Sequence, residues 1–431
     1  MSERSEHPAP GPWPPAPGPR LPAPGPQPPV PGARPLAPGP WPQAPGSFLM
    51  AGGGTGGHVI PALAVARELR QRGRRVFFVG TQRGLEAKLV PAEGFELRPI
   101  DIGGLNRVEM RQKIATLSRL PFTTATCARL LRGVSAVFSM GGYAAGPPVM
   151  AALLRRVPVV VMEPNAVPGF TNRAIGRFVY RALVSFPETA GFFPRGKTEI
   201  TGLPVREEFF SIPPRPRGGA PTVLITGGSQ GSRTLNRAVR ESWPLFLKAG
   251  MPVRIIHQTG PAAVAELRGE FAQTGLEGEV VPFIQDMPAA FAETGLDGEV
   301  APFIQDMAAA FAAADLVVCR SGAGSVSELA AAGKPSVLVP FPFAADDHQT
   351  RNAEVMERGG AARLVPDAEM NGEKLFSLVS ELTRAPELLA RMGEASRKFA
   401  RPGAARRAAE ILEEAAARFR LTPAPRAETI R

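Results

Sequence analysis

Two glycine-rich loops, each between a strand pattern and a helix pattern, constrain the fold of this 431-residue chain more than any other feature. The first, Gly-Gly-Gly-Thr-Gly-Gly-His at residues 52–58, follows the short apolar run 47–51 and precedes a helical pattern that ends near Gly73. The second, at residues 227–231, follows the apolar run 222–226. A strand, a glycine loop and a helix start bring backbone N–H groups up to a phosphate. The sequence therefore predicts two α/β units that each bind an anionic ligand.

The first loop does not fit the two commonest nucleotide-binding signatures. It matches G-x-G-x-x-G, but a dinucleotide fold needs an acidic residue at the end of the next strand, where this chain has Gly-Thr-Gln-Arg at residues 80–83. A P-loop needs Lys at the position of His58. Five glycines exceed what a tight turn with positive φ requires. The loop therefore predicts a phosphate or diphosphate ligand of another kind.

The alternation of β-rich runs with helical patterns predicts parallel sheets. A linker rich in Pro and Gly at residues 212–219 separates two such alternations. We expect a first Rossmann-like domain at residues 47–205, a second at 206–399, and a C-terminal helix within 400–421. Residues 1–46 hold 18 of the 48 prolines, which predicts a disordered or polyproline II tail and not a signal peptide.

The net charge of +11 is concentrated in the first domain, where residues 47–205 carry 21 Arg and Lys against 9 Asp and Glu. A basic half predicts an anionic partner. Without a nucleic-acid-binding motif, and with few aromatic residues, the sequence favours an anionic membrane surface and no nucleic acid. Residues 107–122 mix basic and apolar side chains as an interfacial helix does, although an ordinary amphipathic helix gives the same pattern. No stretch is apolar enough to span a bilayer, and the two cysteines, which lack metal-ligand spacing, fit a reducing cytoplasm.

Two further segments carry polar groups after predicted strands. Glu328 comes one helical turn after a glycine turn at residues 320–324, so it could accept both hydroxyls of a ribose or act only as a first-turn helix charge. The loop at residues 340–352 lies where open α/β sheets place ligand groups. Within it Asp346 and Asp347 could hold a metal ion, but adjacent carboxylates favour a solvated turn.

Eight motifs that occur in one order resemble a single family. They are GGGTGGH at 52–58, GGYAAGPP at 141–148, NAVPGFTNR at 165–173, GGSQG at 227–231, HQTG at 257–260, PFIQDM at 282–287 and again at 302–307, ADLVVCRSGA at 314–323 and AADDHQTRNA at 344–353. Over roughly residues 47–421 the chain resembles the MurG family, bacterial transferases that add N-acetylglucosamine to lipid I and so make lipid II for peptidoglycan synthesis.

The resemblance implies a GT-B fold, which is α/β with two Rossmann-like domains and a cleft between them. It implies acceptor and membrane faces on the first domain, the UDP-sugar on the second, and a C-terminal helix packed back on the first. The expected partners are UDP-N-acetylglucosamine (UDP-GlcNAc), the polyprenyl diphosphate acceptor lipid I, an anionic membrane surface and other proteins of cell-wall synthesis. The expected location is the cytoplasmic face of the cell membrane, as a peripheral protein.

Carried over position by position, the resemblance assigns three groups of site residues. The candidate catalytic bases are His58 and Glu163. The implied donor-binding residues are Thr55, Gly56, Gly57, Asn165, Arg206, Ser229, Ile304, Met307, Ala323, Glu328, His348 and Gln349. The implied acceptor-binding residues are Gly53, Gly54, Tyr143, Thr171 and Asn172.

The implied reaction is an inverting displacement in which the C4 hydroxyl of the muramoyl sugar attacks the anomeric carbon, so a base must take its proton. Family members commonly have His-Glu-Gln-Asn where this chain has Met162-Glu163-Pro164-Asn165, and Asn where it has Leu203. The loss of that histidine favours His58 over Glu163 as the base. No D-x-D motif occurs, so we expect no metal ion and no other cofactor.

Residues 273–292 are followed by a near copy at 293–312 that differs at four positions. We interpret this as a local tandem duplication within the second domain. The second copy has the spacing to the following strand that the family pattern shows. We therefore expect Ile304 and Met307 to line the donor site and residues 273–292 to form a surface bulge.

Two other classes of function remain open on the residues alone. A UDP-sugar 2-epimerase has the same architecture, although it would lack the basic first domain and need more carboxylates in the cleft. A catalytically weak scaffold that binds UDP-GlcNAc is also compatible with Met162 and the duplication. Transfer to a lipid I analogue distinguishes all three.

Overall fold

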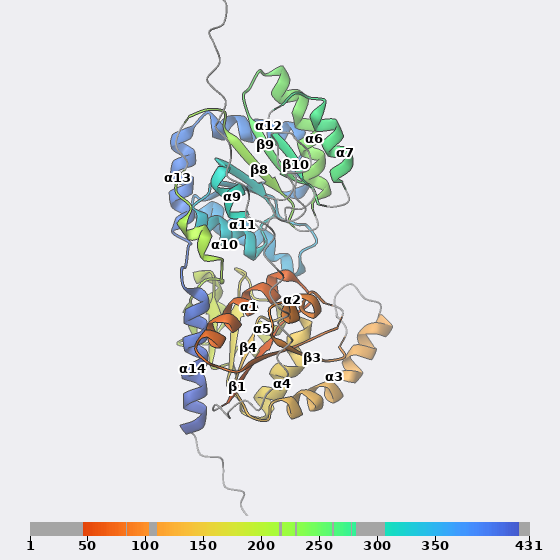
Figure 1. Ribbon diagram of the computed structural model, residues 1–431, viewed down its shortest axis with the longest axis vertical. Helices are drawn as coiled ribbons and strands as arrows, with labels where there is room; N and C mark the ends of the chain where they lie inside the picture. The colour runs from red at the N-terminus through yellow and green to blue at the C-terminus, as the bar shows by residue number, and fades with distance from the viewer. Residues whose placement is uncertain are drawn as a thin grey trace, which may run out of the picture. The chain divides into compact units, whose positions relative to one another are not determined.

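The computed structural model describes residues 46–82, 84–102, 110–214, 218–228, 231–260, 263–276, 278–281 and 307–421, with the backbone alone at 110–117, 264–266, 278–281 and 420–421. The tail expected at residues 1–46 lies outside these residues except for Gly46. The described chain forms two parallel sheets with helices on their faces (Figure 1). The fold class predicted from the sequence is thereby confirmed.

The first sheet has seven strands in the order β3-β2-β1-β4-β5-β6-β7. They are β1 (Ser47–Ala51), β2 (Val76–Gly80), β3 (Glu96–Pro99), β4 (Val134–Ser139), β5 (Val159–Glu163), β6 (Arg181–Val184) and β7 (Thr198–Ile200). The helices between them are α1 (Gly56–Gln71), α2 (Glu86–Ala92), α3 (Met110–Leu130), α4 (Gly146–Leu154) and α5 (Phe170–Ile175), with short 3₁₀ turns η1 (Tyr143–Ala145) and η2 (Pro187–Phe192). We call these elements the first lobe.

The second sheet has six strands in the order β10-β9-β8-β11-β12-β13. They are β8 (Thr222–Thr226), β9 (Arg254–Gln258), β10 (Gly278–Val281), β11 (Leu316–Cys319), β12 (Ser336–Leu338) and β13 (Ala362–Leu364). The helices are α6 (Arg233–Lys248), α7 (Val264–Ala272), α9 (Met307–Ala313), α10 (Ala323–Ala332), α11 (His348–Arg358), α12 (Gly372–Thr383) and α13 (Pro386–Arg397), with 3₁₀ turns η3 (Glu207–Ser211), η4 (Ala345–Asp347) and η5 (Asp367–Glu369). We call these elements the second lobe. The expected domain boundaries themselves stay predictions.

Both glycine loops follow a central strand of their sheet. β1 lies between β2 and β4, and β8 lies between β9 and β11, so each central strand has a parallel neighbour on either side. Parallel strands are connected by helices that cover both faces, which requires apolar side chains on both faces. The run Phe48-Leu-Met-Ala51 is accordingly buried throughout. Each loop therefore starts at the carboxyl end of a buried strand, where parallel sheets place their sites.

The last helix, α14 (Ala404–Leu421), follows the second lobe in sequence but packs on the first, beside α1 and β4 (Figure 1). Its buried side chains recur at helical spacing and join the core cluster that contains Leu63 and Phe138. They are Ala408, Ala409, Ile411, Leu412, Ala415 and Ala416. The chain thus passes between the lobes a second time.

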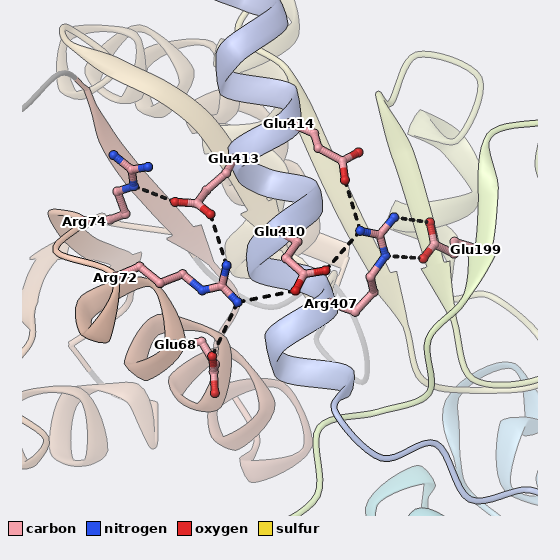
Figure 2. Close-up of polar contacts among 8 residues, drawn as sticks. All are labelled: Glu68, Arg72, Arg74, Glu199, Arg407, Glu410, Glu413 and Glu414. Carbon is pink, nitrogen blue, oxygen red and sulfur yellow. Dashed lines mark hydrogen bonds and ion pairs between the residues drawn. The ribbon is translucent and has the colours of Figure 1, made fainter.

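Ion pairs border this helix on both sides (Figure 2). Arg72 Nη1 and Arg74 Nε donate to Glu413 over 3.2 and 2.6 Å. Arg407 donates to both carboxylate oxygens of Glu199 in β7, over 2.6 and 3.2 Å, and to the neighbouring Glu414. These side chains are a quarter to a half exposed, so the pairs add specificity of docking more than free energy.

The duplicated segment corrects one prediction. Gly278–Val281 of the first copy forms β10, which pairs in parallel with β9 at the edge of the second sheet and is not part of a surface bulge. The second copy supplies α9, which begins at Met307. The sheet thus takes its strand from the first copy and its helix from the second, and residues 282–306 between them lie outside the described residues.

The predicted interfacial stretch falls partly on α3. Residues 103–109 lie outside the described part of the chain, and the helix runs from Met110 onward. The side chain of Phe122 is 78% exposed. None of the described helices is long and apolar enough to cross a membrane.

Candidate functional site

The first glycine loop is built around the buried carboxylate of Glu86 at the start of α2. Its Oε2 accepts a hydrogen bond from the N–H of Gly54 at 2.8 Å, and its Oε1 accepts from the N–H and hydroxyl of Thr81 at 2.9 and 2.7 Å. Burial alone would raise the pKa of Glu86, but these donors bring it below its ordinary value. Glu86 is therefore ionised, and the Gly54 N–H points inward, away from any ligand.

Three glycines leave the space that this carboxylate fills. A Cβ at Gly53, Gly80 or Gly84 would lie 2.4, 2.8 or 2.0 Å from an atom of the Glu86 side chain. None of the three has the positive φ that favours glycine for backbone reasons. Their shared property is close approach to Glu86, a residue that the sequence analysis did not select.

His58 lies in the first turn of α1, partly exposed. Its Nδ1 is 3.3 Å from the carbonyl oxygen of Gly53 and 3.2 Å from the hydroxyl of Thr55. Burial lowers the pKa of His58 below its usual 6.5, the hydrogen bond to Gly53 opposes this, and the charge of His348 in the second lobe lowers it further. The imidazole is therefore neutral near pH 7, as a general base must be.

Glu163, the other candidate base, ends β5 and is 2% exposed. Oε1 accepts from the backbone and side-chain N–H groups of Asn165 at 3.0 and 3.1 Å, and Oε2 accepts from Gly169 N and Asn172 Nδ2 at 3.1 and 3.0 Å. Burial raises the pKa of Glu163 in spite of these four donors. Four donors leave its oxygens little capacity for a substrate, and the geometry gives it the role of orienting both asparagines.

The predicted acceptor-side residues meet around the glycine turn at Gly141 and Gly142. Thr171 donates to Gly142 O at 3.4 Å, and the ring of Tyr143 lies 3.1 Å from where a Cβ on Gly54 would be. Asn172 donates to Met162 O at 3.2 Å. These contacts bring the acceptor group into one neighbourhood with the first glycine loop.

Two of the three departures from the family pattern, Met162 and Leu203, are buried apolar residues. Met162 is fully buried in β5, and Leu203 is 4% exposed; both belong to the core of the first lobe. Each replaces a polar group of the family pattern with a core side chain.

A buried asparagine links the lobes. Asn352 in α11 accepts from Ala166 N at 2.9 Å and donates to Asn165 Oδ1 and to Ser321 O, both at 3.1 Å. The hydroxyl of Ser321 in turn donates to Gln349 O at 2.9 Å. The loop after β5 is thus tied to the loop after β11, and Asn165 lies where the two lobes meet.

Arg320, just after β11, organises the second lobe's site. Its guanidinium donates to Ser232 Oγ at 2.7 Å, to Asp367 Oδ1 at 2.5 Å and to two carbonyl oxygens after β12. Ser232 is also the N-cap of α6, where its hydroxyl accepts from Leu235 N at 3.2 Å. Arg320 therefore fastens the second glycine loop to the neighbouring strands and is largely occupied in doing so.

Glu328 lies in the second turn of α10, partly buried. Its carboxylate has no hydrogen-bond partner among the described residues. Burial raises the pKa of Glu328 to about 7, which nearby Arg206 opposes and Glu208 supports. Arg206 itself pairs with Glu208 at 3.1 Å. To bind a ribose diol, a carboxylate must have both oxygens free to accept hydrogen bonds from the two hydroxyl groups. The carboxylate of Glu328 meets this requirement among the described residues.

His348 and Gln349 begin α11. His348 Nδ1 is 2.5 Å from Ala345 O, and Gln349 Oε1 accepts from Phe341 N at 3.0 Å. Asp346 and Asp347 before them have the positive φ values of 51° and 52°, and Asp347 accepts from Thr350 at 2.6 Å. This is the polar turn that the sequence favoured over a metal pair. Across the described residues no cluster of three His, Cys, Asp or Glu side chains could hold a metal ion.

Of the remaining predicted donor-binding residues, the structure describes Thr55, Gly56, Gly57, Ala323 and Met307 but not Ser229 or Ile304. Gly56 and Gly57 begin α1, and their N–H groups have no partner among the described residues; Thr55 is its N-cap. Ala323 begins α10, and Met307 begins α9 against the core of the second lobe. Ser229 and Ile304 lie outside the described residues.

Two Rossmann-like lobes with their polar groups at the carboxyl ends of the strands define the class, an α/β protein of the GT-B architecture. The crystal structure of Acinetobacter baumannii MurG is similar, with a TM-score of 0.68 and 34% identity over 86% of this chain and 100% of that one. A UDP-N-acetylglucosamine 2-epimerase shares the fold alone, at 12% identity over 88% of this chain and 99% of that one, with a TM-score of 0.56.

The chain matches the glycosyltransferase family 28 N-terminal domain at residues 48–184 and the C-terminal domain of that family at 222–296 and 291–408. It is 70% identical over 369 residues to a Solibacter usitatus (strain Ellin6076) protein named UDP-N-acetylglucosamine–N-acetylmuramyl-(pentapeptide) pyrophosphoryl-undecaprenol N-acetylglucosamine transferase, which covers 86% of this chain and 96% of that protein. The chain belongs to glycosyltransferase family 28 and within it to the MurG transferases. The match to the C-terminal domain is split into two ranges within the duplicated segment. In the structure the same segment supplies a strand from its first copy and a helix from its second.

Proposed function

We propose that this protein transfers N-acetylglucosamine from UDP-GlcNAc to the C4 hydroxyl of lipid I, which gives lipid II. The observation that carries the proposal is that Asn352 joins the polar loops of the two lobes. One lobe supplies the neutral imidazole of His58, and the other supplies the carboxylate of Glu328, which has no hydrogen-bond partner among the described residues. The relatives' name and family membership support the same reaction.

In the proposed reaction the acceptor oxygen forms a bond to the anomeric carbon as the bond from that carbon to the diphosphate breaks. UDP leaves with the electron pair, and His58 takes the hydroxyl proton. The N–H groups of Gly56 and Gly57 at the positive end of α1 stabilise diphosphate charge. Glu328 accepts the ribose hydroxyls, and His348 and Gln349 meet the sugar. No metal ion is required, because the negative charge is met by N–H groups and the sequence lacks a D-x-D motif.

We also propose that the first lobe binds anionic membrane surfaces through α3. Phe122 on α3 and Leu154 on the adjacent α4 are 78% and 77% exposed, and Arg119 is 63% exposed. Charge reversal at Arg111 and Lys113, whose side chains lie outside the described residues, should weaken binding to anionic vesicles by about 1 kcal/mol each, and added salt should weaken it too. Binding insensitive to both would contradict this surface.

The test of the function is incubation of the purified full chain with UDP-GlcNAc and a short-chain lipid I analogue. We expect a β1→4-linked disaccharide product in equal amount to UDP, and an unchanged rate in EDTA. An epimerase would release UDP-N-acetylmannosamine without the acceptor, and a scaffold would bind the donor with no turnover. Either result would overturn the proposal.

A further inference from the structure

One peptide unit connects the buried charge of Glu86 to His58. Its N–H, from Gly54, donates to Glu86 Oε2 at 2.8 Å, and its carbonyl oxygen, from Gly53, lies 3.3 Å from His58 Nδ1. Hydrogen bonds in a chain polarise one another. An anion at the N–H end therefore makes the carbonyl oxygen a stronger acceptor for the imidazole.

The Gly53 carbonyl also fixes which nitrogen of His58 carries the hydrogen. A carbonyl oxygen only accepts, so a hydrogen bond between Nδ1 and this oxygen favours the tautomer with the hydrogen on Nδ1. The Thr55 hydroxyl, 3.2 Å from the same nitrogen, can donate or accept and so does not oppose this. Nε2 is then left unprotonated and available as a base.

The surroundings show that Glu86 is a built feature and not an incidental helix charge. It is fully buried, three donor groups hold it, and Gly53, Gly80 and Gly84 leave the space it occupies. A buried charge is retained at a cost in desolvation free energy. An effect of this charge on the neighbouring imidazole of His58 would account for its retention.

We propose that Glu86 is a positioning residue for the transfer reaction: through the Gly53–Gly54 peptide it holds His58 with Nε2 unprotonated and stabilises the imidazolium formed when His58 takes the acceptor's proton. The proton moves from the hydroxyl to Nε2, and Glu86 stays ionised throughout. The proposal rests on the role of His58 in the proposed function and deepens it.

Charged groups from two elements act on His58. Burial is the main influence and lowers the pKa of His58, His348 from α11 lowers it as well, and Glu86 from α2 raises it. Removal of the Glu86 charge should therefore lower the pKa of His58 further. A Glu86 that only braced the loop would change the rate without this shift.

The experiment compares the wild type, Glu86→Gln and the matched control Glu93→Gln, a half-exposed glutamate at the end of the same helix that pairs with Arg67 at 2.7 Å. In Glu86→Gln we expect the acid limb of kcat/KM to move down by roughly half to one pH unit. We expect the plateau rate to fall by about 3–30-fold. Donor affinity and the control's profile should match the wild type.

NMR of the imidazole nitrogens gives a readout that needs neither turnover nor a folded Glu86→Gln protein. Spectra of the wild type, with His58 assigned by comparison with His58→Asn, should show the hydrogen on Nδ1 in the neutral ring. A hydrogen on Nε2, or an unmoved acid limb in a folded Glu86→Gln protein, would overturn the proposal. Failure of the wild type to transfer sugar would instead count against the proposed function. The NMR measurement does not depend on turnover, so the two failures can be told apart.

Discussion

Three glutamates that look alike in the sequence have different states because their surroundings differ. Glu86 is held by donors that lower its pKa, whereas burial raises the pKa of Glu163 in spite of its four donors. Glu328 has no donor among the described residues, and its pKa is raised to about 7. Its carboxylate is therefore the one that a bound ligand could satisfy and stabilise.

Glu328→Ala should raise the KM for UDP-GlcNAc by about 10–100-fold, or roughly 1.5–3 kcal/mol, because both ribose hydroxyls lose their acceptor. Donor affinity of the wild type should also fall as the pH drops through about 7, since a protonated carboxyl accepts only one hydroxyl well. Isothermal titration across pH 5.5–8.5 measures both effects. Glu381→Ala, which removes a 55% exposed glutamate in α12 of the same lobe, is the control, and equal effects of the two changes would leave Glu328 a helix charge only.

The resemblance to the MurG family selected His58, Glu163 and Asn172, and Glu328 was selected both by that resemblance and by the glycine turn before it. The sequence did not single out Glu86, because an acidic residue in the first turn of a helix is common and has no distinctive pattern. Its role depends on Gly53, in the loop after β1, and on Gly80, at the end of β2, and Gly84, before α2, which all approach Glu86. That convergence is a property of the fold, and it gives a second reason for Gly53, which the phosphate-binding interpretation assigned to the ligand.

At the scale of elements, α14 shows which forces dock a helix on another lobe. Its apolar face is fully buried at Ile411 and Leu412, while Glu413 beside them is about a quarter exposed and ion-paired. Burial of a leucine outweighs a partly exposed ion pair by a factor of several. The apolar face should therefore hold the helix in place.

Leu412→Ala should lower the free energy of unfolding by about 2–4 kcal/mol, and Glu413→Gln by at most about 1 kcal/mol, with the smaller effect reduced further in salt. Chemical denaturation followed by circular dichroism measures both. A loss for Glu413→Gln as large as that for Leu412→Ala would mean that the ion pairs of Figure 2 contribute as much to the docking as the apolar face.

Deletion of one repeat, residues 283–302, should leave the fold intact and the donor KM within about threefold, because it removes none of the described residues and joins β10 to α9 at a single-copy spacing. Size-exclusion chromatography and donor titration measure this. A deletion variant that fails to fold would show that the intervening residues are required.

The strands were predictable because parallel strands buried on both faces give continuous apolar runs. The assignment of the duplicated copies was not, because the two copies have nearly the same local preferences. Only the pairing of Gly278–Val281 with β9 reveals that the first copy keeps the strand. The spacing argument placed the helix α9 on the second copy, as the structure does, but it did not show that the first copy supplies the edge strand β10.

At the scale of the whole molecule, the base and the donor carboxylate come from different lobes, and Asn352 bridges them. The sequence predicted two lobes and a shared site, since two glycine loops and a family pattern require them. It did not predict the bridge, because Asn352 looks like an ordinary residue of an amphipathic helix. The division of labour implies that base and donor contacts can be removed separately.

The central claim is that His58, and not Glu163, takes the acceptor's proton. The direct test is single-turnover transfer from UDP-GlcNAc to a lipid I analogue by the wild type and His58→Asn, with donor affinity measured in parallel. We predict a rate about 10²–10⁴-fold lower in His58→Asn, loss of the acid limb that lies below pH 6.5, and unchanged donor binding. A His58→Asn protein that kept both its rate and that limb would contradict the account and make Glu163 the base.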